Sequence, residues 1–319
     1  QLIINKFKQL LKRKGFLIFF CMIEHFSQKY GYEPDMDTID SQLSILARDI
    51  DGAMTPEMLA ACFGMMDLTS LKNNDTPSSI CRMVEKADAF KKYYPSYPNP
   101  ASVCVFSNFA PVVKACKKSE DIHITVVSGV FPHSQSFLEV KLLECRMAVE
   151  AGADEVDVVI ALNAFLDGDY ERVYDELSAI RKAVDEAAAS QGRTVILKAI
   201  LETGLLVTPE NIAVASFIAM EAGVDFIKTS TGKTEVSATP SAAYIMCECI
   251  RAFFKATGRK VGFKPAGGMT TGRDAACYYL IVSSVLGKEW LDKSLFRFGV
   301  SRMANNLLSD LEQCKVNYF

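Results

Sequence analysis

The sequence is poor in the residues that build the commonest metal and hydrolytic sites. Its 319 residues include only three histidines, His25, His123 and His133, and these form no spaced cluster. A histidine-based zinc site or a Ser–His–Asp relay is therefore not expected. The ten cysteines form no C-x-x-C framework, and a chain of this size does not need disulfides to fold. We therefore predict a reduced, cytoplasmic protein.

The sequence also lacks a strong charge excess and a membrane-spanning run. The formal net charge is −3, without the basic asymmetry of a nucleic-acid binder, so no nucleic-acid partner is expected. Near the N-terminus, five basic residues precede an apolar run over residues 15–23, an order that resembles a secretory signal. No small-residue cleavage site follows, and the run is shorter than the roughly 20 residues that span a bilayer. These features favour a non-essential extension over residues 1–45, with a targeting segment as the alternative, and they predict no membrane partner.

Eight apolar runs typical of buried strands alternate with helical patterns along most of the chain. They span residues 65–71, 102–107, 124–130, 155–161, 194–202, 226–232, 261–266 and 295–300. Such alternation predicts a parallel sheet, and a (β/α)8 barrel needs about 250 residues. The competing doubly wound sheet usually carries G-x-G-x-x-G after its first strand, and none is present there. We therefore predict an α/β fold with a single (β/α)8 TIM barrel over residues 46–319.

Two lysines lie at the ends of apolar runs, where a charged side chain is unusual. Lys198 follows Val195-Ile-Leu, and Lys228 follows Phe226-Ile. Lysine is almost never fully buried without a partner, and two such lysines one strand–helix unit apart predict that two amines meet in a pocket. Each cation disfavours charging of the other, and burial acts in the same direction. The pair therefore predicts a neutral amine, which is a nucleophile toward aldehydes and ketones.

Three further ionisable residues, Asp67, Asp157 and Lys264, interrupt predicted strands. One such charge could equally be an interior salt bridge, but charges on five strands favour a shared site at the carboxyl ends of the strands. An unperturbed lysine with a pKa of about 10.4 is neutral in roughly one molecule in 2,500 at pH 7. Lowering that pKa by about 3 units costs roughly 4 kcal/mol, which a second ammonium can supply. Asp157 would oppose the shift, so we expect it to transfer protons.

Glycines and hydroxyl residues follow the last four predicted strands. The clusters are Thr203-Gly204, Ser230-Thr-Gly-Lys233, Gly267-Gly268 and Gly299-Val-Ser301-Arg302. Glycine lets main-chain N–H groups approach an anion, and helix N-termini add a favourable dipole. A Gly-Gly pair alone is more simply explained as a tight turn. Because barrels often bind phosphate after strands seven and eight, the two clusters in those loops predict a phosphate site.

Seven motifs occur in an order and spacing that extend over residues 55–312. They are Asp67-Leu-Thr69, Val103-Cys-Val105, Gly152-Ala-Asp-Glu-Val-Asp157-Val-Val, Leu197-Lys198-Ala-Ile-Leu-Glu202-Thr-Gly204, Asp225-Phe-Ile-Lys228-Thr-Ser-Thr-Gly232-Lys233, Gly262-Phe-Lys264-Pro-Ala-Gly-Gly268 and Phe296-Arg-Phe-Gly299. This pattern resembles the deoxyribose-phosphate aldolase family, class I (Schiff-base) aldolases built on a (β/α)8 barrel. The fifth and sixth motifs are the most specific.

The resemblance implies reversible cleavage of 2-deoxy-D-ribose 5-phosphate to acetaldehyde and D-glyceraldehyde 3-phosphate. It implies that Lys198 forms the Schiff base and that Lys228 lowers its pKa. Asp157 would drive a proton relay that includes Asp67. The residues implied to hold the phosphate are Gly204, Gly232, Lys233, Gly267, Gly268, Gly299 and Ser301. No metal and no cofactor are implied, because the iminium itself is the electron sink.

Two other functions stay open from the sequence: a Schiff-base barrel aldolase that acts on a longer sugar phosphate, and a non-catalytic sugar-phosphate-binding barrel. Two positions bear on the family pattern. Arg302 stands where family members often have a serine, and Tyr318 is a candidate for a tail tyrosine that reaches the active site. A homodimer is one assembly that the sequence allows.

Overall fold

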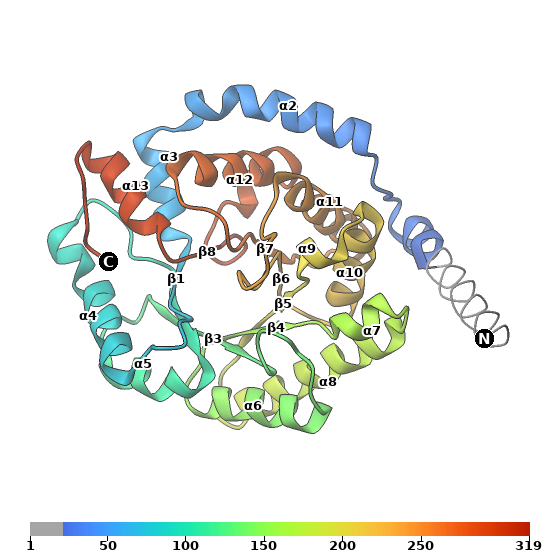
Figure 1. Cartoon of the computed structure of the whole chain (residues 1–319), viewed down its shortest axis with the longest axis horizontal. Coiled ribbons are helices and arrows are strands. Elements are labelled where there is room, and N and C mark those ends of the chain that lie inside the picture. Colours follow the sequence, from blue (N-terminus) through green and yellow to red (C-terminus); the bar gives the residue numbers. More distant parts are fainter. Residues whose placement is uncertain (1–21) are drawn as a thin grey trace, which may run out of the picture.

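A computed structural model describes residues 22–319, which form a barrel of eight parallel strands surrounded by helices (Figure 1). The strands are β1 (Met66–Thr69), β2 (Ser102–Phe106), β3 (His123–Ser128), β4 (Glu155–Val159), β5 (Ile196–Ile200), β6 (Phe226–Lys228), β7 (Gly262–Lys264) and β8 (Phe298–Val300). Their order is β7-β6-β5-β4-β3-β2-β1-β8, and parallel bridges Phe263–Phe296 and Ala266–Gly299 join the two ends of that sheet. The predicted (β/α)8 barrel is confirmed, and each predicted run overlaps one strand.

Helices cover the outside of the barrel (Figure 1). They are α2 (Met36–Ala53), α3 (Pro56–Gly64), α4 (Pro77–Tyr93), α5 (Ala110–Cys116), α6 (Leu138–Glu150), α7 (Leu162–Leu166), α8 (Tyr170–Ala189), α9 (Thr203–Leu206), α10 (Pro209–Glu221), α11 (Pro240–Thr257), α12 (Gly272–Val285) and α13 (Met303–Glu312), with 3-10 turns η1 (Ser107–Phe109) and η2 (Lys288–Trp290). Capping threonines begin several of them. At α10 the Thr208 hydroxyl accepts from the Asn211 N–H, and a proline follows in the first turn.

The interior of the barrel is charged where a soluble core is usually apolar. All five residues of β4 are buried. Because side chains alternate along a strand, Val156 and Val158 face the helices while Glu155 and Asp157 face the barrel axis. The same alternation puts further charged side chains on the axis from neighbouring strands. These inward-facing charges form the candidate site described below.

The segment before the barrel packs onto its outside. Helix α2 lies against α11 and α12, and its Ile39 and Ile50 are buried (Figure 1). Residues 22–30 are also helical, and Phe26 and Tyr30 stack on Phe217 of α10. Residue 45, the expected boundary of the extension, lies within α2, and that division of the chain stays a prediction.

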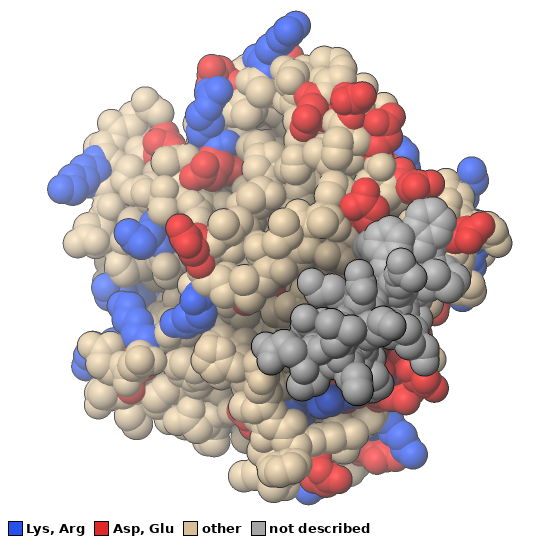
Figure 2. Space-filling view, turned by 45° about the vertical axis from the view of Figure 1, so that its right-hand side comes forward, with Lys and Arg blue, Asp and Glu red and all other residues tan. Residues whose placement is uncertain are grey.

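The basic residues before position 15 and most of the apolar run over residues 15–23 lie outside the described residues. Within residues 22–319, no helix has both the length and the apolar character needed to cross a bilayer. Acidic and basic side chains are interspersed over the face shown in Figure 2, without a continuous basic stripe.

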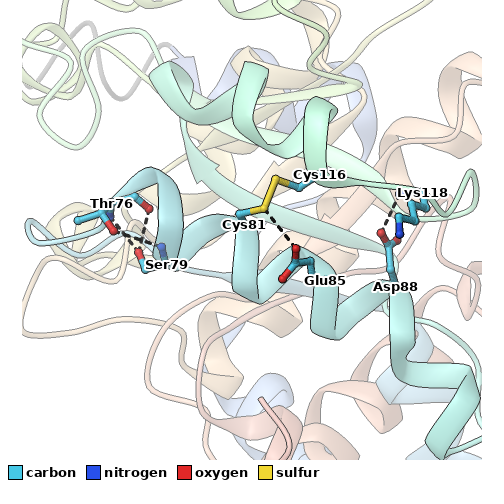
Figure 3. Close-up of a disulfide and its surroundings, with 7 residues drawn as sticks. All are labelled: Thr76, Ser79, Cys81, Glu85, Asp88, Cys116 and Lys118. Carbon is cyan, nitrogen blue, oxygen red and sulfur yellow. Dashed lines mark hydrogen bonds between the residues drawn. A yellow bond between two sulfur atoms is a disulfide. The ribbon is translucent and has the colours of Figure 1, made fainter.

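A disulfide ties α4 to α5, which the sequence analysis did not predict (Figure 3). The Cα atoms of Cys81 and Cys116 lie 5.7 Å apart, within the range that a disulfide requires. Nearby, the Asp88 carboxylate accepts from the main-chain N–H of Lys118 at 2.7 Å, joining the same two regions. The expectation of a fully reduced protein is therefore wrong for this pair, although seven other cysteines among the described residues are free. A cytoplasmic location stays a prediction.

Candidate active site

Seven charged residues meet inside the barrel. They are Asp67 of β1, Glu155 and Asp157 of β4, Lys198 of β5, Lys228 of β6, Lys264 of β7, and Arg297, which directly precedes β8. Each is at most 3% exposed. We call these seven residues the charge cluster. Burial of so many charges is tolerated only where each has partners of opposite sign.

Asp157 is the centre of the charge cluster. Its Oδ1 accepts a hydrogen bond from Nζ of Lys198 at 2.9 Å. Its Oδ2 accepts from both Lys228 and Lys264, each at 2.8 Å. One carboxylate thus holds three lysine amines around it, and the amines of Lys228 and Lys264 share a single oxygen.

The other two carboxylates anchor the cluster to the barrel wall. The Arg297 guanidinium donates to Asp67 and to Glu155, at 2.6 Å each. Lys198 also donates to Glu155, and Lys264 pairs with Asp67. Lys198 and Lys264 are therefore each bound by two carboxylates at hydrogen-bond distance, and Lys198 also lies 4.0 Å from Asp67, whereas Lys228 contacts Asp157 alone.

The charge cluster contains three carboxylates and four cations, so it carries one positive charge too many if every group is ionised. Burial alone would raise the pKa of Asp157, but Lys198, Lys228 and Lys264 outweigh it and hold that pKa far below its usual range. The pKa values of Asp67 and Glu155 are lowered by neighbouring cations in the same way. All three carboxyl groups therefore stay ionised at neutral pH, and the excess positive charge disfavours protonation of the cation with the fewest carboxylate partners.

Lys228 is the cation that is least able to stay charged. Burial is the main cause that lowers its pKa, Lys264 lowers it further, and Asp157 only partly opposes them. Burial also acts on Lys198, but Asp157 and Glu155 outweigh it and raise the pKa of Lys198. The pKa of Lys264 is likewise raised, against burial, by Asp157 and Asp67. Of the three lysines in the charge cluster, Lys228 is thus the one whose pKa is lowered.

Strand register explains why Lys228 differs from Lys198. Lys228 lies opposite Ile200 of β5, two residues beyond Lys198, whereas Lys198 lies opposite Phe226. Lys228 is thus one inward-facing layer closer to the carboxyl ends of the strands. There it lines a pocket of about 320 Å³, while Lys198 and Lys264 are fully buried and do not line it.

The pocket above Lys228 has the composition of an anion site. Its walls come from the ends of β1, β6, β7 and β8 and include Thr69, Lys72, Thr231, Gly232, Lys233, Gly267, Gly268, Gly299, Ser301 and Arg302. The main-chain N–H groups of Gly232, Gly268 and Ser301 donate to no main-chain carbonyl within the described chain. Three cationic side chains and these N–H groups can therefore hold a phosphate a short distance from a buried amine.

Residues 43–276 match the DeoC/LacD family of aldolases. The chain belongs to this aldolase family. It is 43% identical over 258 residues to proteins of Homo sapiens and Mus musculus named deoxyribose-phosphate aldolase, covering 78% of this chain and 77% of each relative. The fold is also similar to that of a solved deoxyribose phosphate aldolase from Aeropyrum pernix, described as a unique tetrameric structure, with a TM-score of 0.61 at 24% identity, covering 82% of this chain and 97% of the other.

The structure of this aldolase changes the roles expected for its lysines. The sequence analysis assigned the lowered pKa to Lys198 and the supporting charge to Lys228. The directions of the two pKa shifts are the reverse, because Lys198 has two carboxylate partners and Lys228 has one. The cation that shares an oxygen with Lys228 and lowers its pKa is Lys264. Both predicted lysines contact Asp157, and Asp67 joins them through Lys264. Only Lys228 lines the pocket in which the two amines were expected to meet, because Lys198 is fully buried.

Six of the seven predicted phosphate residues line the pocket, and Gly204 does not. Gly204 lies in α9 and borders a separate hollow. A Cβ atom at this position would come within 2.3 Å of the Val236 carbonyl oxygen, so close packing explains the glycine there. Gly267 differs, because its φ is +79° and a Cβ atom there would come within 2.6 Å of Ser237 Oγ and 3.1 Å of the Gly232 Cα, which excludes a side chain inside the pocket wall.

Two residues of the charge cluster were not assigned from the sequence, and one expected residue lies elsewhere. Glu155 precedes Asp157 by two residues, so strand alternation could have placed both on one face. Arg297 interrupts the last apolar run and was also overlooked. Tyr318 does not line the pocket: its hydroxyl donates to the Lys86 carbonyl at 2.7 Å and its ring packs on α4. Within the described residues, no three His, Cys, Asp or Glu side chains are grouped to hold a metal.

Proposed function

We propose that this aldolase cleaves 2-deoxy-D-ribose 5-phosphate reversibly to acetaldehyde and D-glyceraldehyde 3-phosphate, and that Lys228 is the Schiff-base lysine. Relatives at 43% identity bear the corresponding name. The observation that carries the assignment is the position of Lys228, whose amine has a lowered pKa and borders the pocket with the phosphate-binding features. A lysine at an unperturbed pKa would be almost entirely protonated and unreactive at neutral pH.

The reaction begins at the aldehyde carbon C1 of the open-chain sugar. The neutral Nζ of Lys228 forms a bond to C1, and loss of water gives a cationic iminium. Removal of the C3 hydroxyl proton allows the C2–C3 bond to break, and its electrons enter the iminium to form an enamine. D-Glyceraldehyde 3-phosphate leaves. A proton added at C2 regenerates an iminium, whose hydrolysis releases acetaldehyde and the free amine.

Asp157 and Lys264 serve the proton transfers in this scheme. Asp157 lies 2.8 Å from Nζ of Lys228, within the distance at which it can move protons as water is lost and regained. Its lowered pKa means that it returns each proton quickly to water or substrate. Lys264 keeps its charge and disfavours protonation of Lys228. Lys198 and Arg297 position the carboxylates and have no contact with the pocket.

Phosphate binding fixes the distance between the sugar phosphate and the amine. Gly232, Lys233, Gly267, Gly268, Gly299 and Ser301 are the proposed phosphate residues. Lys233 donates to the Leu71 carbonyl at 2.6 Å, which holds its amine at the pocket wall. Binding energy from the phosphate is available to orient C1 over Lys228.

Reductive trapping tests the assignment of Lys228. Protein incubated with acetaldehyde and borohydride should gain one reduced two-carbon adduct on Lys228, located by peptide mass spectrometry. Lys228→Ala should abolish the adduct and lower turnover of deoxyribose 5-phosphate by at least about 10⁴-fold. Lys233→Ala is the matched control, because it removes a lysine from the same pocket and should keep the adduct. An adduct on Lys198 instead would overturn the assignment.

A further inference from the structure

A second and larger pocket adjoins the proposed phosphate site. Its volume is about 710 Å³. The walls come from the loop after β1, from one face of α4, from α13 and from the chain after α13. These elements lie together at one side of the barrel mouth in Figure 1. We call this hollow the rim pocket, and the substrate described above does not account for it.

The rim pocket is strongly basic. Five cationic side chains line it, from Lys72, Arg82, Lys86, Arg302 and Lys315. Asp75 is the one carboxylate side chain among the described residues of its lining. That carboxylate is already used by its own loop, because it accepts from the Ser70 hydroxyl at 2.8 Å and from the Lys72 N–H at 2.8 Å. The rim pocket therefore holds a positive charge with little to neutralise it.

The five cations also lack partners outside the rim pocket. Among residues 22–319, no salt bridge includes any of them. Two exposed arginines elsewhere on the surface do have partners, Arg172 with Glu176 and Arg251 with Glu248, although pairing is not general among exposed arginines. Like charges gathered in a concave surface raise the local potential and attract anions. The arrangement costs free energy unless an anion relieves the repulsion.

The wall formed by the end of the chain is fixed in place. Asn305 Oδ1 accepts from the N–H groups of Tyr318 and Phe319, at 2.9 Å each. Ser309 Oγ accepts from the Val316 N–H at 2.9 Å. Lys315 directly precedes Val316 and lines the rim pocket. A wall that is already ordered does not have to be immobilised when a ligand binds.

We propose that the rim pocket binds a small molecule with two or more phosphate groups, as a site distinct from the substrate phosphate site. A single phosphate would occupy only a small part of the volume and reach only some of the five cations. A chain of phosphates can contact Arg82 and Lys86 on α4 together with Arg302 across the hollow. Arginine is well suited to such bidentate phosphate contacts.

Occupation of the rim pocket should affect the aldolase reaction. Lys72, Ser301 and Arg302 line both hollows. A polyphosphate that draws Lys72 and Arg302 toward the rim removes two cations from the substrate phosphate and adds negative charge beside it. The ligand should therefore raise KM for deoxyribose 5-phosphate without lowering kcat at saturation. This consequence, unlike the binding itself, rests on the proposed function.

The proposal is tested with inorganic tripolyphosphate as the probe, measured by titration calorimetry on the full chain. We expect one site per chain. Arg82→Gln with Lys86→Gln should weaken binding by at least about tenfold, since both cations face the rim pocket and neither lines the Lys228 pocket. Orthophosphate should bind this site far more weakly than tripolyphosphate.

Two further variants control the experiment. Lys91→Gln with Lys92→Gln removes the same charge from exposed positions of α4 outside the rim pocket and should change binding less than about twofold. Lys233→Gln alters only the proposed substrate site. Three outcomes would each overturn the proposal. The first is that tripolyphosphate does not bind the wild type at all. The second is that the Lys91→Gln, Lys92→Gln variant loses as much affinity as the Arg82→Gln, Lys86→Gln variant, and the third is that Lys233→Gln loses more affinity than the Arg82→Gln, Lys86→Gln variant. Because binding is read without turnover, failure of the aldolase assignment would leave this result intact.

Discussion

The charge cluster and the rim pocket use the same residue types in opposite ways. Inside the barrel, four cations lie at hydrogen-bond distance from three carboxylates, and all seven side chains are almost fully buried from solvent. At the rim, five cations face one carboxylate that is already engaged, and most of their side chains are exposed. Paired and buried cations hold the barrel interior together. Unpaired and exposed cations contribute little to stability and leave charge available to a ligand.

Lys228 lies at the boundary between these two regions. It has a carboxylate partner, as the cluster cations do, and it borders a pocket, as the rim cations do. Its lowered pKa follows from having one partner where Lys198 and Lys264 have two. The number of carboxylate partners thus distinguishes Lys198 and Lys264 from Lys228, the lysine proposed to react, and substitutions can test that distinction.

The largest expected effect is on stability, from Lys198→Met. This change leaves Glu155 and Asp157 each without one buried partner. Removing one member of a buried ion pair costs about 3–5 kcal/mol, so the free energy of unfolding should fall by that amount. Urea unfolding monitored by circular dichroism measures it.

The matched control for this change is Lys228→Met, which removes the excess cation and leaves three carboxylates with three cations. It should cost less than about 1.5 kcal/mol, the value of one hydrogen bond. If Lys228→Met destabilised the protein as much as Lys198→Met, the number of carboxylate partners would not determine how much each lysine contributes to stability.

The next effect is on the pH dependence of the reaction, from Lys264→Met. Removing this cation takes away a cause that lowers the pKa of Lys228, so that pKa should rise. Because only the neutral amine reacts, a higher pKa moves the acid limb of the kcat/KM profile to higher pH, by about one unit or more. The rate lost at pH 7 should then return as the pH is raised.

Lys264→Arg provides the control, since it retains the positive charge beside Asp157. Its acid limb should stay within about 0.3 units of the wild type. If the acid limb of the Lys264→Met profile stayed at the wild-type pH, Lys264 would not be a cause of the lowered pKa of Lys228.

The smallest expected effect comes from the rim. Arg82→Gln with Lys86→Gln breaks no ion pair, so the free energy of unfolding should change by less than about 0.5 kcal/mol. Relief of like-charge repulsion would make any change stabilising. Thermal unfolding at low and high salt measures it, and a loss of several kcal/mol would show that these side chains have structural partners.

Much of the barrel could be predicted because strands buried on both faces leave a direct signal in the sequence. Near-continuous apolar runs located all eight strands, and charges inside those runs located Asp157, Lys198 and Lys228. The division of roles between the two lysines could not be predicted in this way. It depends on the register between β5 and β6, which places Lys228 one layer nearer the mouth, and both lysines follow similar apolar residues.

Contacts between segments far apart in the chain could not be predicted from the sequence either. Cys81 and Cys116 are 35 residues apart and have no motif spacing, so their bond depends on how α4 and α5 pack. The rim pocket brings together residues from both ends of the barrel sequence, such as Arg82 and Arg302. Single-sequence patterns report local periodicity, and they carry no information on which surface cations converge.

The odd number of charges in the cluster has a consequence for the covalent intermediate. In the proposed mechanism, Lys228 condenses with an aldehyde to give a protonated imine, so the nitrogen that attacks as a neutral amine carries a positive charge in the adduct. Burial and Lys264, which lower the pKa of Lys228, also act on the charged adduct, where they favour the flow of electrons from the breaking carbon–carbon bond into the protonated imine. The same surroundings disfavour the charged covalent adduct relative to the free enzyme. They therefore favour hydrolysis of the adduct and release of acetaldehyde.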